Sequence, residues 1–428
     1  MDAVLQCFQC RYSNESLRDF LKYDSRPLGG VLQLKSLKND KLIQLIQCTL
    51  ELKREYNSHC TAGKLTPQLF ELGNEQLKLL NRIADGETAW ITDPLWVSAR
   101  QLLSISRLLD RDFAGNIKQN VRDSNNQKSK GDLEEEKYLE KCVRTVHTSF
   151  KLCLNDRNPD ARQNKKWGVY FFTNLELSIY ERLHNRDMVR NLVKVIQSRT
   201  AELPTPEQAL CAHKAQLVTY YYHMAEFYGC YEMDYERGFA FAQKAWLLSR
   251  AGGGPQENVI CLLLVPFALL ARRWYPDLAV LGSRHAAVAE LYGPVVECLR
   301  NGDLLTFEKW LSKHEQLLLR RNLYVAMVMV RELVVLKLVK RAVGFMGAGP
   351  ILSLRGVAAA LVHSDSRSSL ASAVSEDALD RTECTLASLI SKGYVKGYLS
   401  HSNRALVVSK TNAFPKLAVR GVRAREST

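Results

Sequence analysis

The sequence predicts a mainly α-helical protein, an α-solenoid of stacked helix pairs (TPR-like) that ends in a C-terminal winged-helix domain. Helical periodicity recurs from the first residues onward, whereas strand-like alternation is almost absent before residue 393. The stretch GYVKGYLSHSNRALVVSK, residues 393–410, then reads as two short strands joined by a tight polar turn. A single hairpin directly after a run of short helices is the order of a winged helix, so we expect this β-hairpin to be its wing.

Composition and charge restrict the kind of partner. The chain has 428 residues, is 46% apolar and carries a formal net charge of +14, with a pI near 9.2. This length predicts two or three domains or one extended helical array. The positive charge favours an anionic partner and leaves nucleic acid, a membrane surface and an acidic polypeptide open.

Cysteine usage and the apolar runs indicate a protein of a reducing compartment without a membrane-spanning segment. The eleven cysteines are scattered, and Cys7-x-x-Cys10 has no second ligand pair to complete a zinc site. The N-terminus, MDAVLQCFQC, lacks the basic start of a signal peptide. The most apolar run, 259–270, is shorter than the roughly 20 residues that cross a bilayer. We therefore expect a core helix, kinked at Pro266, and no membrane insertion.

Residues 1–160 form a predicted N-terminal helical region. Apolar residues at helical spacing recur through it. The polar stretch 122–132 predicts an exposed loop, and a new helix is expected to open at Glu134, where acidic residues suit the positive helix N-terminus. A second polar break, 155–166, closes the region.

Residues 161–349 form the predicted helical-repeat part. A helical hairpin is expected with its turn near His184, and a second helix pair with its turn near Met233. Alternating large and small residues in the second pair are typical of interlocking helices. A long helix over about 322–343 is apolar on nearly every side, so neighbours must cover it, and the glycines of 344–350 are expected to end it.

Residues 350–428 form the predicted winged helix and a basic tail. From Ile351 the pattern changes to short helices and a Ser-rich connection. A variant capping box, Asp380-x-x-Glu383, is expected to introduce the helix that precedes the hairpin. Gly393 is placed to cap the C-terminus of that helix.

The sequence contains no recognisable catalytic motif. There is no HExxH, Walker phosphate loop or nucleophile elbow. Gly344, Gly347 and Gly349 have the wrong spacing for a dinucleotide fingerprint and follow a helix rather than a strand. His213 and His223 are separated by roughly 1000° of helical rotation and lie on different faces. We expect no enzyme, and therefore no catalytic residue, cofactor or metal ligand.

Basic and hydroxyl side chains of the predicted winged helix fall where such a domain meets nucleic acid. Those on the solvent side of the recognition helix are Arg381, Thr385, Ser388 and Lys392, and those on the wing are Lys396, His401, Arg404 and Lys410. A second basic cluster flanks the long apolar helix and comprises Arg320, Arg321, Arg331, Lys337, Lys340 and Arg341. Of these, Lys337, Lys340 and Arg341, which we call the second basic group, are the predicted nucleic-acid contacts. Such groups suit phosphate contacts, which weaken with salt and bind any sequence.

Alternatives to nucleic-acid contact stay open. The basic side chains of the winged helix can form an ordinary solvated face, and those beside the long helix can snorkel from the core. The hairpin would then pair with another protein through apolar side chains of its strands, Tyr398, Leu406 and Val407.

Two stretches carry a resemblance to a known family. In 292–324 a Tyr, an apolar helix, the Gly302-Asp303 turn and an amphipathic helix with Phe307 follow one another. This order resembles that of the PCI-domain family of proteasome-lid, COP9 signalosome and translation-initiation subunits. The segment 383–410 is similar to one branch, that of PCI domain-containing protein 2, COP9 signalosome subunit 12-like proteins and the PCI subunit of the TREX-2 mRNA-export complex. Where this branch usually shows Arg-Asn-Leu, the chain has Lys337, Leu338 and Val339.

The resemblance implies a non-enzymatic subunit of a nuclear TREX-2-like mRNA-export complex that couples transcription to export. It implies docking on a larger PCI-type scaffold, a small acidic disordered polypeptide shared with the proteasome lid as a second partner, and sequence-tolerant binding of RNA or DNA. The location it implies is the nucleus, including the nuclear pore, with a cytoplasmic fraction. The alternative is a pure scaffold subunit of a proteasome-lid, COP9 signalosome or translation-initiation type assembly, without nucleic-acid binding.

Overall fold

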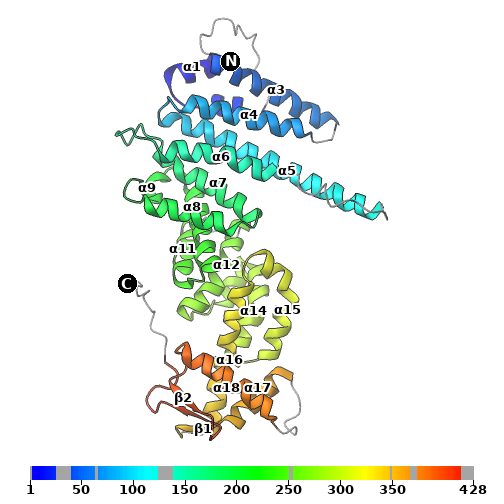
Figure 1. Cartoon of the computed structure of the whole chain (residues 1–428), viewed down its shortest axis with the longest axis vertical. Coiled ribbons are helices and arrows are strands. Elements are labelled where there is room, and N and C mark those ends of the chain that lie inside the picture. Colours follow the sequence, from blue (N-terminus) through cyan, green and yellow to red (C-terminus); the bar gives the residue numbers. More distant parts are fainter. Residues whose placement is uncertain are drawn as a thin grey trace. The chain divides into compact units, whose positions relative to one another are not determined.

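The computed structural model of the protein describes residues 2–25, 40–62, 66–123, 138–249, 254–347, 349–366 and 374–415. These residues are mostly helical, with one small sheet near the C-terminus, so the predicted fold class is confirmed (Figure 1). The chain divides into two compact units, Met1–His223 and Met224–Thr428. The predicted helix start at Glu134 and the basic tail from 416 lie outside the described residues, as does most of the predicted loop 122–132.

The first unit is a stack of helices. Its elements are α1 (Asp2–Cys10), α2 (Glu15–Leu21), α3 (Asp40–Ala62), α4 (Pro67–Ala84), the 3₁₀ turn η2 (Ala89–Ile91), α5 (Thr92–Asp123), α6 (Tyr138–Leu154), the 3₁₀ turn η3 (Lys166–Gly168), α7 (Val169–Arg182), α8 (Arg186–Ser198), α9 (Pro206–Ala209) and α10 (Lys214–Glu226), in which the unit ends. From α3 to α8 each helix packs against the next along the chain, and α4 also packs against α6. This nearest-neighbour packing is that of a helical solenoid.

The predicted turn at His184 is confirmed. His184 adopts a left-handed backbone with φ 54°, and the next residue, Asn185, accepts a hydrogen bond from the backbone N–H of Met188 at 3.1 Å. An Asn side chain that takes up one of the unpaired N–H groups of a helix start is a favourable N-cap. The short polar turn therefore ends α7 and begins α8 within a few residues.

The helical part of the second unit continues this design. It consists of the π-helical turn η4 (Phe227–Tyr231), α11 (Tyr235–Leu248), α12 (Pro255–Arg272), α13 (Leu278–Arg284), α14 (Ala286–Asn301), α15 (Leu304–Arg320) and α16 (Tyr324–Met346). The predicted turn near Met233 is confirmed by its φ of 56°, and Asp234 caps α11 by accepting from the N–H of Arg237 at 3.1 Å. Both turns are thus built by one left-handed residue followed by a polar cap.

Two apolar helices lie in the core of this unit. One of them is α12, which is long and apolar enough to cross a membrane. This is weak evidence for a membrane span, because the core helices of proteins outside membranes meet the same criterion. Here α12 packs against α11, α14 and α16. The long helix predicted over 322–343 is α16, which continues to Met346 before Gly347 ends it with φ 102°. It packs against α12, α14, α15 and α17, which explains why it is apolar on several sides.

The winged helix contains β1 (Ile351–Ser353), α17 (Leu354–Ser366), α18 (Glu376–Ser391), β2 (Gly397–Ser400) and β3 (Ala405–Val408). The strands form an antiparallel sheet of order β1-β3-β2 (Figure 1). We expected short helices from Ile351 onward, and this is wrong for the first three residues. The reason is that β1 is held by pairing with β3, a distant partner, and is too short to show its own periodicity.

The start of α18 also differs from the prediction. Ser375 is the N-cap and accepts from the N–H of Ala378 at 3.2 Å, so the helix begins well before the expected capping box of Asp380 and Glu383. Its end is as expected, because Gly393 has φ 77° and the N–H of Tyr394 reaches back to the carbonyl of Leu389 at 2.9 Å.

Candidate functional site

The sheet of the winged helix has an inner and an outer row of apolar side chains. The register places Leu352, Leu406 and Leu399 side by side in one row and Ile351, Val407 and Tyr398 in the other. Successive side chains of a strand point to opposite faces of the sheet, so the two rows lie on opposite faces. The row of Ile351, Val407 and Tyr398, which we call the outer row, is open to solvent, with Ile351 69% and Tyr398 63% exposed.

The three predicted interface residues lie on different faces of the sheet. Tyr398 and Val407 lie on the outer row, whereas Leu406 is 0% exposed. Leu406 belongs to the inner row, on the side where α17 and α18 contact the sheet, so its placement as an interface residue is corrected: it is a core residue. Ile351 was missed because it lies on β1, the strand that local periodicity did not indicate.

The wing turn is held against α18 by a cluster of ion pairs. The guanidinium of Arg404 contacts three carboxylates of α18, at 2.7 Å from Asp380, 3.1 Å from Glu383 and 3.3 Å from Glu376. Its backbone carbonyl accepts from the N–H of Leu354 at 2.9 Å. Arg404 therefore connects the wing to α18 and to the start of α17, and its charge is balanced inside the domain.

Glu383 is shared between two basic residues of the wing. His401 Nδ1 lies 2.8 Å from its carboxylate, and Arg404 contacts the same oxygen. The hydrogen bond from His401, with that from Arg404, lowers the pKa of Glu383 below its usual value despite partial desolvation. A carboxylate with a lowered pKa stabilises the folded state above its unfolded pKa, and this contribution is lost as the pH falls through the folded value.

We expect Arg404→Ala to loosen the wing. The substitution removes all three ion pairs, and the melting temperature should fall by about 2–4 °C, whereas Arg381→Ala should leave it unchanged. Arg381 is a suitable control because it is largely exposed and, among the residues that the structure describes, its ion pair is with Asp377, one turn away on α18. Differential scanning calorimetry measures both variants, and equal melting temperatures would show that the cluster does not hold the wing.

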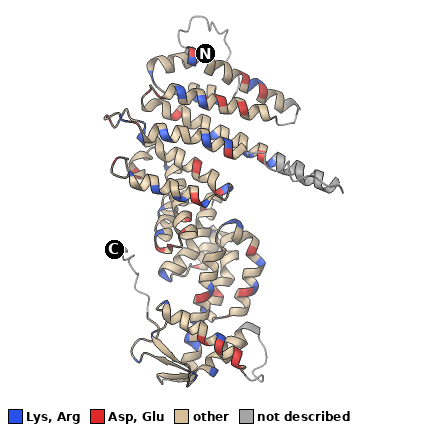
Figure 2. Ribbon diagram, in the orientation of Figure 1, with Lys and Arg blue, Asp and Glu red and all other residues tan. Residues whose placement is uncertain are grey.

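The other predicted nucleic-acid contacts of the winged helix have mixed surroundings. Lys392, at the end of α18, forms an ion pair with Glu332 of α16, and Thr385 donates to the carbonyl of Arg381 at 2.8 Å. The backbone N–H of Lys396 donates to the carbonyl of Ala413 at 2.8 Å, while its side chain is exposed, as are Ser388 and Lys410. Figure 2 shows acidic and basic residues interspersed in this unit. The structure thus brings acids to four of the eight predicted contacts: Arg381, Lys392, His401 and Arg404.

The second basic group does not form one surface for a phosphate chain. The ammonium of Lys340 lies 5.9 Å from the ring centre of Phe414, in the segment after the wing. Arg341 donates to the backbone carbonyl of Asn301, and Lys337 is half-buried. Lys340 and Arg341 therefore contact neighbouring parts of the protein, as expected for side chains that extend from a core helix.

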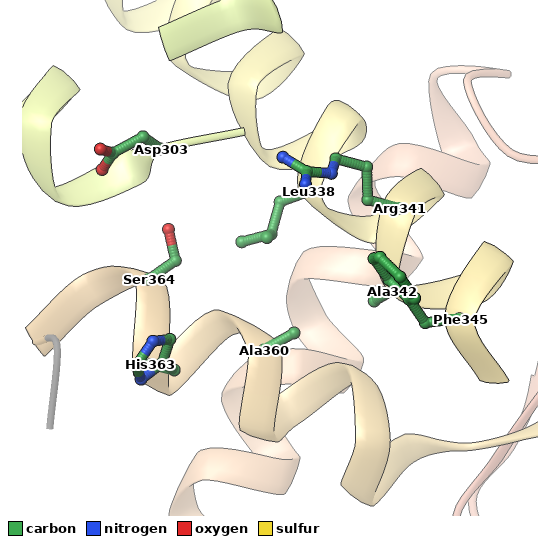
Figure 3. Close-up of a pocket in the computed structure, with 8 residues that line it drawn as sticks. All are labelled: Asp303, Leu338, Arg341, Ala342, Phe345, Ala360, His363 and Ser364. Atoms are coloured by element: carbon green, nitrogen blue, oxygen red, sulfur yellow. The ribbon is translucent and has the colours of Figure 1, made fainter. Parts of the chain in front are cut away.

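A pocket of about 350 Å³ lies beside Arg341, between α16, α17 and the turn that joins α14 to α15 (Figure 3). Two of its polar side chains already form hydrogen bonds within the protein. The Ser364 hydroxyl accepts from the N–H of Leu304 at 2.9 Å, and Asp303 accepts from the N–H of Thr306 at 3.0 Å. These bonds fix the turn against α17. The pocket has the size of a small ligand site, but these polar groups have the geometry of helix caps.

A helical stack that ends in this three-stranded winged helix has the architecture of PCI-type subunits. No protein-family model matches the chain. It is 39% identical to COP9 signalosome complex subunit 12 of Eremothecium gossypii over 420 residues, which cover 97% of this chain and 98% of that protein. The proteins of the same name from Saccharomyces cerevisiae and Kluyveromyces lactis are 36% and 33% identical, again over 97% of this chain and 99% and 98% of theirs. The chain belongs to the COP9 signalosome subunit 12 family.

These relatives correct the expected function. The predicted TREX-2-like mRNA-export subunit with a nucleic-acid platform, located at the nuclear pore, is wrong, because the relatives are named as subunits of the COP9 signalosome. They favour the alternative, a scaffold subunit of that type of assembly. The expectation of export rested on one branch of the resemblance and on charge, and net charge does not identify a partner.

Proposed function

We propose that this chain is a non-catalytic scaffold subunit of a COP9 signalosome-type complex. The observation that carries the proposal is its similarity, over nearly the full length of both chains, to proteins named COP9 signalosome complex subunit 12. Because the similarity covers both units, the proposal concerns the whole chain. The commitment of Asp303 and Ser364 to helix capping supports a structural role for the pocket beside them.

The outer row is the surface that we assign to a neighbouring subunit. Its three apolar side chains lie side by side, and β1 and β2 are the edges of the sheet. A strand edge with unpaired backbone groups next to exposed apolar residues is a ready site for another chain. Large apolar and aromatic side chains such as Ile351 and Tyr398 are also the type that contributes most in the centre of an interface.

A small acidic polypeptide is the second partner that we propose. The net charge of +14 supports it, since an acidic segment would neutralise part of this excess. Exposed basic residues of the second unit that pair with no acid in the described part of the chain include Lys396 and Lys410. Such an attraction would weaken as salt is raised.

The double variant Ile351→Asp, Tyr398→Asp tests the assignment of the outer row. Two charges in this row would remove apolar contact area and should reduce recovery of signalosome subunits with the tagged chain by roughly tenfold. The tagged chain is recovered at moderate salt from Saccharomyces cerevisiae cells that lack their own relative, and bound proteins are quantified by mass spectrometry.

The matched control is Ser388→Asp, Ser391→Asp, which adds the same two acidic charges to exposed positions of α18, outside the outer row. It should leave the recovery of signalosome subunits unchanged, and circular dichroism should show both variants folded. Undiminished recovery with the outer-row variant would refute this surface. Absence of signalosome subunits from the wild-type sample would refute the proposed complex itself.

A further inference from the structure

A groove in the helical part of the second unit is lined mainly by apolar side chains, and four large aromatic residues lie among them. It has a volume of about 340 Å³ and lies between α11, α12 and the segment that leads into α13. The residues that we call the aromatic groove are Phe239, Trp246, Trp274, Tyr275, Pro276 and Val280. None of them belongs to the winged helix, so the groove is separate from the outer row.

Three aromatic rings of the groove are exposed, and one of them, Trp274, packs against the buried ring of Phe239. Trp274 is 57%, Tyr275 48% and Trp246 39% exposed. Trp274 packs edge-on against Phe239, with 5.6 Å between ring centres. Large apolar side chains that gather on a surface in this way mark binding sites more often than solitary ones do. The packing against Phe239 lowers the entropic cost of using Trp274 as a contact.

Most polar groups of the groove are hydrogen-bond donors, and Gln243, whose side-chain amide offers both a donor and an acceptor, also lines it. Within the described residues, the indole N–H groups of Trp246 and Trp274 and the hydroxyl of Tyr275 have no protein partner, so all three can donate to a ligand. The carboxylate of Asp277 already accepts from the N–H of Ala279 at 2.9 Å and of Val280 at 3.3 Å. The lining therefore offers several donors together with apolar ring faces, and one oxygen of its carboxylate, Oδ1 of Asp277, is already used by α13.

We propose that the aromatic groove binds a proline-rich segment of a partner protein in the polyproline II conformation. Proline has no backbone N–H, so such a segment presents carbonyl acceptors and apolar rings and requires few acceptors from its receptor. Aromatic-lined grooves recognise it in this way at low entropic cost, because the conformation is already extended before binding.

The charged residues of the groove favour a proline-rich partner over an acidic one. Arg284 and Asp277 are the charged residues along the lining, one of each sign. An acidic segment would gain little from such a balanced pair, whereas aromatic rings and N–H donors suit proline and its carbonyl groups. The proposal goes beyond the proposed scaffold function and does not depend on which complex the chain joins.

The experiment titrates the full chain with a short fluorescein-labelled polyproline peptide and measures fluorescence anisotropy. Trp274→Ala should weaken binding by about tenfold, and Tyr275→Phe, which removes one donor and little else, by about fivefold. Phe345→Ala is the matched control, since Phe345 is a highly exposed aromatic residue of α16 outside the groove, and it should not change the affinity.

Three outcomes would overturn the proposal. They are the absence of saturable binding of the polyproline peptide, an equal loss of affinity in Phe345→Ala, and tighter binding at this groove of an equally long peptide of glutamate and leucine. Circular dichroism of each variant excludes loss of folding as the cause, and Tyr275→Phe keeps the test decisive if Trp274→Ala unfolds.

Discussion

Replacing Gly302 with alanine is expected to lower the free energy of unfolding of the second unit by about 2–4 kcal/mol. Gly302 ends α14 with φ 70°, a left-handed conformation that costs an L-residue roughly 1 kcal/mol or more. A Cβ atom there would also lie 2.9 Å from the Cα and the backbone N of Leu338 on α16. Because backbone atoms form this contact, no side chain can rotate away, and α16 would have to shift.

Urea unfolding followed by tryptophan fluorescence measures the effect, and Trp310, which packs against Phe307 of the same helix α15, is one of the reporters in this unit. Gly344→Ala is the matched control: Gly344 lies on α16 with no atom within 4 Å of an added Cβ. Since alanine is the better helix former, this variant should gain about 0.5 kcal/mol or stay neutral. A small, equal effect of both substitutions would show that α16 does not approach Gly302 closely.

The turns of the fold are the part that sequence predicts best. Gly302, Gly393 and the polar runs around His184 and Met233 were placed at helix ends, and all four adopt positive φ in the structure. These signals are local, since glycine tolerates the left-handed conformation that a chain reversal requires, and short polar residues such as Asn185 and Asp234 cap the helix that follows. Long apolar periodicity also predicts helices well, because the spacing of apolar residues within one helix indicates which of its faces is buried.

Features that depend on distant segments could not be predicted in this way. Ile351 becomes a strand residue only because Val407 pairs with it, and Glu383 serves the wing rather than the start of α18. Arg404 illustrates the limit for the candidate site: its charge is visible in the sequence, but the three carboxylates around it belong to a helix that only the fold brings near. A basic residue is therefore a weak predictor of a nucleic-acid contact until its neighbours are known.

Lys165 is a further residue whose role could not be read from its surroundings in sequence. It lies in the polar run 155–166 and is of a residue type that is ordinarily exposed, yet it is buried. Its ammonium donates to the carbonyls of Ala84 at 3.1 Å and Glu87 at 2.7 Å, and Asp156 lies 3.6 Å away. Lys165 thus fastens the polar run to the end of α4 and to the turn that follows it.

The stability of this arrangement depends on pH through Asp156. Burial alone would raise its pKa, but hydrogen bonds from the backbone N–H groups of Asn158 and Lys165, together with the Lys165 ammonium, lower it below the usual value. The stabilisation is therefore present above the unfolded pKa of about 3.9 and is lost as the pH falls through the lower, folded value. Protonated Asp156 no longer attracts Lys165, so the ion-pair part of the Lys165 contribution should disappear in acid.

We expect Lys165→Met to lower the free energy of unfolding of the first unit by about 3 kcal/mol at neutral pH. The substitution leaves the carbonyls of Ala84 and Glu87 without their donor and Asp156 without its ammonium partner. Lys166→Met is the matched control: its ammonium makes one exposed hydrogen bond, to the carbonyl of Glu202 at 3.3 Å, and its loss should cost less than about 0.5 kcal/mol. Urea unfolding followed by fluorescence of Trp90 and Trp167, which lie next to this segment, measures both variants at neutral pH and below the folded pKa of Asp156. The cost of Lys165→Met should shrink in acid, whereas a cost independent of pH would mean that the carbonyl contacts alone stabilise the segment and the ion pair contributes nothing.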